Sequence, residues 1–151
     1  MLKFLNDFMQ NRILLAAIAG WAIAQAVKAI LYAIVNRDFK LERLVGSGGM
    51  PSSHAATVCA LMTATIKQFG AGSFEFAISL ILTAVVLHDA RGVRQEAGKQ
   101  AVTITAIIDH LIQEGEMIKL PEYELKELIG HTPFQALIGS LMGIGVGIWL
   151  G

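Results

Sequence analysis

The sequence predicts an all-α integral membrane protein: a helical bundle of about four spans plus an amphipathic helix, in a single domain over residues 1–151. Two observations support this fold class. The residues are 54% hydrophobic and 16% charged, whereas an ordinary soluble domain carries about 25% charged residues. The charges also fall between long uncharged runs. Because about 20 apolar residues cross a bilayer core as a helix, these runs indicate membrane spans.

The first apolar run, Ile13–Val35, contains 23 residues and one charge, Lys28. It predicts a first helix over Asn11–Val35. A secretory signal peptide explains this run less well, because its apolar region has about 7–15 residues and ends at a small-residue cleavage site. Here a polar Asn-Arg-Asp sequence follows instead. A glycine-rich polar loop is therefore expected over Asn36–Met50.

Three further membrane helices and the amphipathic helix complete the predicted bundle. Proline suits the first turn of a helix, since its missing N–H costs nothing there. Apolar residues at helical spacing predict the amphipathic segment. The expected elements are a second helix from Pro51 to the break at Gly70-Ala71-Gly72, a third over Phe74–His88, the amphipathic helix over Ala97–Gln113, an acidic connector over Pro121–Glu127, and a fourth membrane helix from Thr132-Pro133 to residue 151.

Glycines recur every four residues in the last helix, at Gly139, Gly143 and Gly147. Small residues at this spacing let helix backbones approach closely in lipid. Two partners for this face remain open. The first, which we favour, is another helix of the same bundle, and the second is another copy of the chain in a homo-oligomer.

Composition also excludes several other classes of protein. Lys plus Arg and Asp plus Glu number 12 each, so the net charge gives no reason to expect a nucleic acid or an acidic partner. A single cysteine, Cys59, excludes an internal disulfide and a cysteine-rich metal site. The expected partners are instead membrane lipids.

Three polar clusters should meet at one membrane face, because each span reverses the side of the membrane. The clusters are Pro51–His54, His88–Arg94 and Gly130–Pro133. Each lies where a predicted helix meets that face. The same face carries eight of the 12 Lys and Arg residues, so the positive-inside rule predicts that it is the cytoplasmic face of a bacterial plasma membrane.

The three clusters have the chemistry of a phosphate site. A helix start after a glycine-rich loop favours an anion, and guanidinium groups match phosphate geometry. Two histidines can act as nucleophile and general acid. No cofactor or metal is expected, since cationic side chains can stabilise the transferring phosphoryl group. Each residue alone has a structural explanation, such as a helix cap, but their joint placement favours a site. The expected catalytic residues are His54 and His131, and the expected substrate-binding residues are Ser52, Ser53, Asp89, Arg91, Arg94, Lys99 and Lys126.

Three ordered motifs resemble the divergent type-2 phosphatidic acid phosphatase family, also called acid phosphatase/vanadium-dependent haloperoxidase-related. The motifs are Gly48–His54, Asp89–Ala101 and Gly130–Pro133, and the resemblance covers nearly the whole chain. It implies a membrane phosphatase acting on a lipid phosphate or pyrophosphate. In this family pattern His54 protonates the leaving group, and His131 attacks phosphorus to give a phosphohistidine.

The sequence departs from the pattern of the wider superfamily in all three motifs. In the classical Pro-Ser-Gly-His motif, Ser53 replaces the glycine. The classical first motif is a Lys and an Arg that precede Pro-Ser-Gly-His, and here Lys40 and Arg43 are the candidates. In the third motif Lys126 is the nearest upstream cation, and Gln135 occupies the position of the aspartate. An amide can orient a histidine but cannot stabilise its charged form. Two hypotheses follow: a lipid phosphatase, or a non-catalytic membrane protein that binds a phosphorylated lipid or partner.

Overall fold

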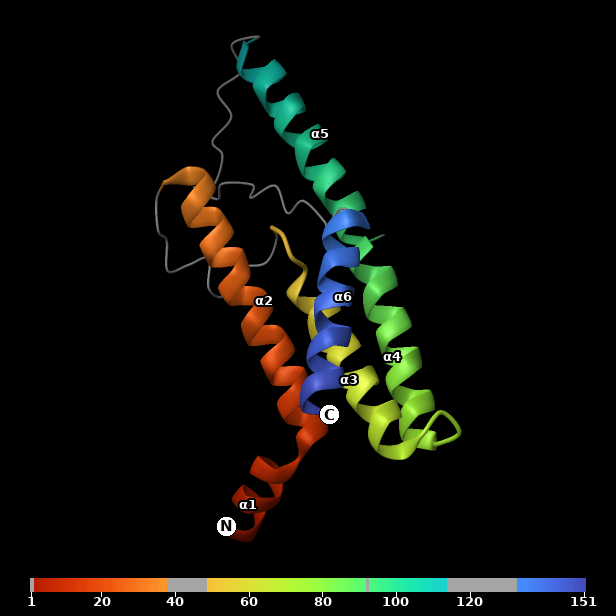
Figure 1. Ribbon diagram of the computed structural model, residues 1–151. Coiled ribbons are helices and arrows are strands. Elements are labelled where there is room, and N and C mark those ends of the chain that lie inside the picture. Colours follow the sequence, from red (N-terminus) through yellow and green to blue (C-terminus); the bar gives the residue numbers. More distant parts are fainter. Residues whose placement is uncertain (1, 38–48, 92, 114–132) are drawn as a thin grey trace.

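The computed structural model describes residues 2–37, 49–91, 93–113 and 133–151, and every regular element in these ranges is a helix. The all-α prediction is therefore confirmed. Figure 1 shows the helices of residues 12–36, 53–69, 74–91 and 133–150 side by side in a bundle, while those of residues 2–10 and 93–113 extend from its opposite ends. The helices are α1 (Leu2–Gln10), α2 (Arg12–Asn36), α3 (Ser53–Phe69), α4 (Phe74–Arg91), α5 (Val93–Gln113) and α6 (Pro133–Leu150).

The four bundle helices match the expected ranges closely, because local residues set their ends. Asn11 caps α2 by accepting a hydrogen bond from the Leu14 N–H at 3.1 Å. Gly70, with φ of 84°, ends α3 and donates its N–H to the Ile66 carbonyl. A positive φ favours glycine there, since it has no Cβ. Ser73 then starts α4 by accepting from the Phe76 N–H at 3.1 Å.

The sequence suggested that Pro51 lies in the first turn of α3, but in the structure it precedes the helix. The cap is Ser52, whose hydroxyl accepts a hydrogen bond from the Ala55 N–H at 3.3 Å. Pro51 precedes this cap and follows a cis peptide bond. A serine side chain can satisfy one of the free N–H groups of a helix start, so the helix begins one residue after Ser52. The amphipathic helix was expected over Ala97–Gln113. In the structure this helix is α5, which begins four residues earlier, at Val93.

The interior of the bundle consists of small residues, and the large apolar side chains lie outside. Ala16, Ala24, Ala56 and Ala60 are completely buried. Trp149 is 76% exposed, and many aliphatic side chains are exposed as well, including Ile30, Ile34, Ile78, Ile81, Val85 and Leu141. Soluble proteins bury such residues, whereas lipid solvates them and small residues pack helices together in a membrane. This distribution is that of a membrane bundle.

Two helices, α2 and α6, are long and apolar enough to cross a membrane among the described residues. The helix between them in the bundle, α3, has 17 residues. Its neighbour α4 has 18 residues, with Glu75 in its first turn and Asp89 and Arg91 near its end. Four complete spans therefore stay a prediction.

The glycines of α6 pack against α3, which lies at the centre of the bundle. A Cβ added at Gly139 or Gly143 would meet the backbone oxygen of Ser52 or Ala56, and one at Gly147 would lie 2.8 Å from the Ala60 oxygen. The favoured interpretation of this spacing, an interface inside the bundle, is confirmed. Because α3 occupies this face, it is closed to a second copy of the chain.

Candidate functional site

The last turn of α4 and the first turns of α3 and α6 lie at the same end of the bundle, whereas the last turns of α2 extend away from them (Figure 1). The described parts of all three predicted clusters lie at these ends. A backbone hydrogen bond joins two of them directly, since the Ser52 N–H donates to the Gln135 carbonyl at 3.2 Å. The start of α3 and the start of α6 are therefore held together, although 83 residues separate Ser52 from Gln135 in the sequence.

The two serines build the start of α3. Ser52 is completely buried, and its hydroxyl oxygen is the cap that accepts from the Ala55 N–H. Ser53 is 5% exposed, and its carbonyl oxygen accepts a hydrogen bond from the Thr57 hydroxyl at 2.7 Å. Both residues thus have a structural role in this conformation. Their predicted contact with phosphate stays a prediction.

His54 lies in the first turn of α3, directly after the serines, and is partly buried. Its ring nitrogen Nδ1 is buried. Asp89 is also partly buried and lies near the end of α4. The structure thus places His54 at the end of the bundle where α3 and α6 begin, which we call the polar end, and its role as a general acid stays a prediction.

Several predicted site residues fall outside the description. His131 and Lys126 lie outside the described residues, as do Lys40 and Arg43. Arg91 is the last residue of α4, and Arg94 and Lys99 belong to the first half of α5, but their side chains lie outside the description as well. The roles expected for these residues stay predictions.

The structure adds a buried lysine that the sequence reasoning passed over. Lys28 is 4% exposed and lies on the face of α2 that points into the bundle. A Cβ placed on Gly49 would stand 3.5 Å from Lys28 Cγ and 3.6 Å from Cδ. The alkyl chain of Lys28 therefore packs beside the segment that leads directly into Pro51 and Ser52. A charged residue inside an apolar run is itself a sign of function in a membrane protein, and this signal was present in the sequence.

Gln25 lies on the same face of α2, one turn before Lys28, and is 6% exposed. Its amide oxygen Oε1 is buried and has no hydrogen-bond partner within the part of the chain that the structure describes. Because α2 approaches Ala56 of α3 at Gly20 and approaches Gly49 at Lys28, Gln25 lies at the height of the α3 start. Gln25 and Lys28 are thus two buried polar residues on the face of α2 that packs near the start of α3.

These groups have the chemistry to hold an anion. The start of α3 offers the positive end of a helix dipole, and Lys28 adds a full positive charge nearby. Among the described residues, no group of three or more His, Cys, Asp and Glu side chains has the arrangement of a metal site. Phosphate recognition at this end of the bundle stays a prediction.

Comparison with known proteins agrees with the motifs and the fold. Residues 9–146 match the model of the "Divergent PAP2 family". The chain is also similar to the "Uncharacterized membrane protein YuiD" of Bacillus subtilis (strain 168), with 35% identity over 146 residues, which cover 91% of this chain and 92% of that protein. No solved structure matches the chain. The protein is therefore a membrane protein of the divergent PAP2 family, related to the type-2 phosphatidic acid phosphatases.

Proposed function

We propose that the polar end of the bundle hydrolyses a lipid phosphate or pyrophosphate through a phosphohistidine intermediate. The observation that carries this proposal is the position of Lys28. Lys28 is buried, and its alkyl chain packs beside Gly49, which leads into the start of α3. A cation and a helix dipole at one place favour a bound phosphate. The lipid would present its head group from the surrounding bilayer.

The reaction would proceed in two steps. First, an imidazole nitrogen of His131 attacks phosphorus, the bond from phosphorus to the leaving oxygen breaks, and His54 gives that oxygen a proton. Next, water attacks the phosphohistidine, His54 takes a proton from the water, and inorganic phosphate leaves as His131 is released. A histidine can act as the nucleophile in covalent catalysis, and a second histidine can donate and accept the proton as general acid and base. Lys28, Arg91 and Arg94 would stabilise the charge on the transferring group.

A second candidate function is binding of a phosphorylated lipid without turnover. Two observations favour it. Ser52 is buried, its hydroxyl oxygen is engaged as the cap of α3, and its N–H donates to the Gln135 carbonyl of α6. Gln135 supplies an amide where a carboxylate would stabilise a charged histidine. A site of this kind would recognise phosphate but would lack part of the machinery for its transfer.

Phosphate release from a panel of lipid phosphates and pyrophosphates by the purified protein tests the two functions. We expect wild type to release phosphate and His131→Ala to form no acid-labile phosphohistidine. We expect His54→Ala still to form it from a substrate with a good leaving group, because such a group needs little protonation. Equal phosphate release by wild type and His131→Ala would end the catalytic proposal, and binding without release by wild type would support the second function.

Gln135→Glu is expected to raise the rate of hydrolysis by about tenfold, since the partner of a catalytic histidine is worth about 10–100-fold. The substitution leaves the backbone carbonyl that accepts from Ser52 in place. Gln135→Met is the matched control, because it changes the side chain without adding a charge. The readout is phosphate release at saturating substrate. No change with glutamate would mean that the missing carboxylate does not limit this site.

We also infer that α3 and α4 cross the membrane with α2 and α6, with the polar end facing the cytoplasm. The two ends can be labelled separately after Cys59, which is buried, is replaced by alanine. Gly72 lies in the turn between α3 and α4 with open space around it, and Asn36 is exposed at the opposite end of the bundle. A thiol reagent that does not cross membranes should label Gly72→Cys in intact cells and leave Asn36→Cys unlabelled. Labelling of Asn36→Cys alone would reverse the orientation.

A further inference from the structure

The first helix, α1, is amphipathic and is set apart from the bundle. Its polar residues fall on one side at helical spacing, and on that side the Gln10 amide donates to the Asn6 side chain at 3.3 Å. The apolar residues fall on the other side. Three of these have described side chains and all are exposed, with Met9 at 63%, Leu5 at 51% and Phe8 at 40%. An exposed apolar side of this kind needs a partner other than water.

The place of α1 in the fold indicates what this partner is. A break at Asn11 separates α1 from α2, so α1 ends where a candidate membrane span begins, and it is turned away from the axis of α2 (Figure 1). Trp149, at the end of α6, lies at the same end of the bundle and is 76% exposed. Tryptophan gathers at the boundary between lipid and water. Both features place α1 at this boundary.

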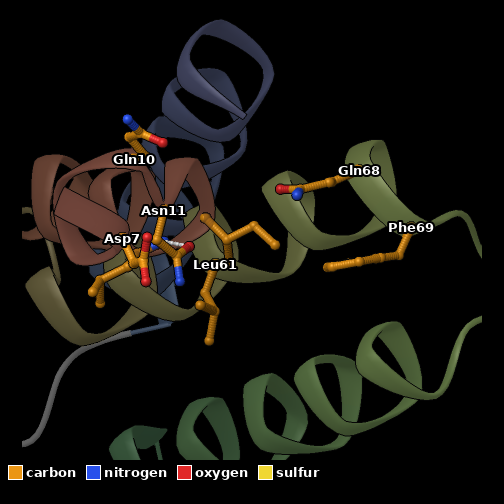
Figure 2. Close-up of a pocket in the computed structure, with 8 residues that line it drawn as sticks. Asp7, Gln10, Asn11, Leu61, Gln68 and Phe69 are labelled. Carbon is orange, nitrogen blue, oxygen red and sulfur yellow. Dashed lines mark hydrogen bonds between the residues drawn. The ribbon is translucent and has the colours of Figure 1, made fainter. Parts of the chain in front are cut away.

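A cleft of about 530 Å³ next to α1 shows which side of the helix faces away from lipid (Figure 2). From α1 it is lined by Asp7 and Gln10, and from α3 by Leu61, Gln68 and Phe69. The polar side of α1 therefore faces this cleft. Leu5, Phe8 and Met9 do not line it. The apolar side is thus turned away from the cleft.

We propose that α1 is an in-plane membrane anchor whose apolar side enters the lipid next to α2. Helices of this composition sit about 5–10 Å into the boundary between head groups and acyl chains. Lys3 and Asp7 give the polar side one charge of each sign, so apolar contact and not attraction to anionic lipids holds the helix. The occupant of the exposed side is the bilayer itself. This inference concerns the end of the bundle opposite to the phosphate site and does not depend on it.

Tryptophan fluorescence of the full chain in lipid vesicles tests the proposal. Trp21 and Trp149 are first replaced by phenylalanine, and a single tryptophan is then placed at Phe8 on the apolar side or at Asn6 on the polar side. Circular dichroism and thermal unfolding confirm that each variant is folded. We expect lipids brominated on the upper acyl chain to quench Phe8→Trp severalfold more than Asn6→Trp. Acrylamide added to the water should show the opposite order.

Any other quenching pattern would contradict the proposal that α1 is a membrane anchor. Equal quenching of both tryptophans by acrylamide would place α1 in water. Protection of Phe8→Trp from both quenchers would mean that protein covers the apolar side, as in contact with a second copy. Equal quenching of both variants by brominated lipid would place the whole helix within the acyl chains, without a polar side at the surface.

Discussion

Replacing Lys28 by methionine is expected to weaken phosphate binding by at least about thirtyfold while the protein remains folded. Removing one partner of a buried charge-assisted contact costs about 2 kcal/mol or more, and each 1.4 kcal/mol is about tenfold in affinity. Methionine keeps most of the length of the alkyl chain that packs beside Gly49. Turnover should fall with binding.

The measurement pairs the dissociation constant for inorganic phosphate and a short-chain lipid phosphate with thermal unfolding in the same detergent. Lys67→Met is the matched control, since Lys67 lies at the other end of α3 and donates to the Ile148 carbonyl at 2.7 Å. The Lys67→Met substitution also removes one positive charge, but it should leave phosphate binding unchanged. Loss of binding in both variants would indicate a general effect of net charge, and unchanged binding in Lys28→Met would remove Lys28 from the site.

Gly143→Ala is expected to lower the free energy of unfolding by about 1–3 kcal/mol, the usual range for adding a methyl group to a filled interior. The added Cβ would meet the backbone carbonyl of Ala56, which cannot move aside as a flexible side chain could. The helices α3 and α6 would have to separate, and the hydrogen bond from the Ser52 N–H to the Gln135 carbonyl would weaken. Phosphate binding should fall along with stability.

Gly145→Ala is the control, because Gly145 belongs to the same helix and a Cβ there meets nothing within 4 Å. Alanine also favours a helix over glycine, so this variant should be as stable as wild type or more stable. Both free energies can be measured by titrating folded protein in mixed micelles with a denaturing detergent. Equal stability of the two variants would contradict the close approach of α6 to α3.

The sequence by itself determined the membrane location, the family and most of the helix ends. The apolar runs predicted α2 and α6, the two described helices that are long and apolar enough to cross a membrane, and Asn11, Gly70 and Pro133 lie where helices end or begin. Such local effects can be read directly from residue types. The α1 helix was missed, although its pattern is local as well. Lys3 and Asp7 interrupt its apolar residues, so it has no uncharged run, and only its helical spacing marks it.

The tertiary structure alone decided which residues meet. The sequence could show that Lys28 interrupts an apolar run, but only the packing of α2 on α3 shows that it lies beside Gly49. The glycines of α6 left two partners open until α3 was found against them, and the contact from Ser52 to Gln135 joins two distant motifs. These contacts depend on the relative position of helices that are far apart in the chain. Helical spacing shows which residues share one side of a helix, but not which part of the protein packs against that side.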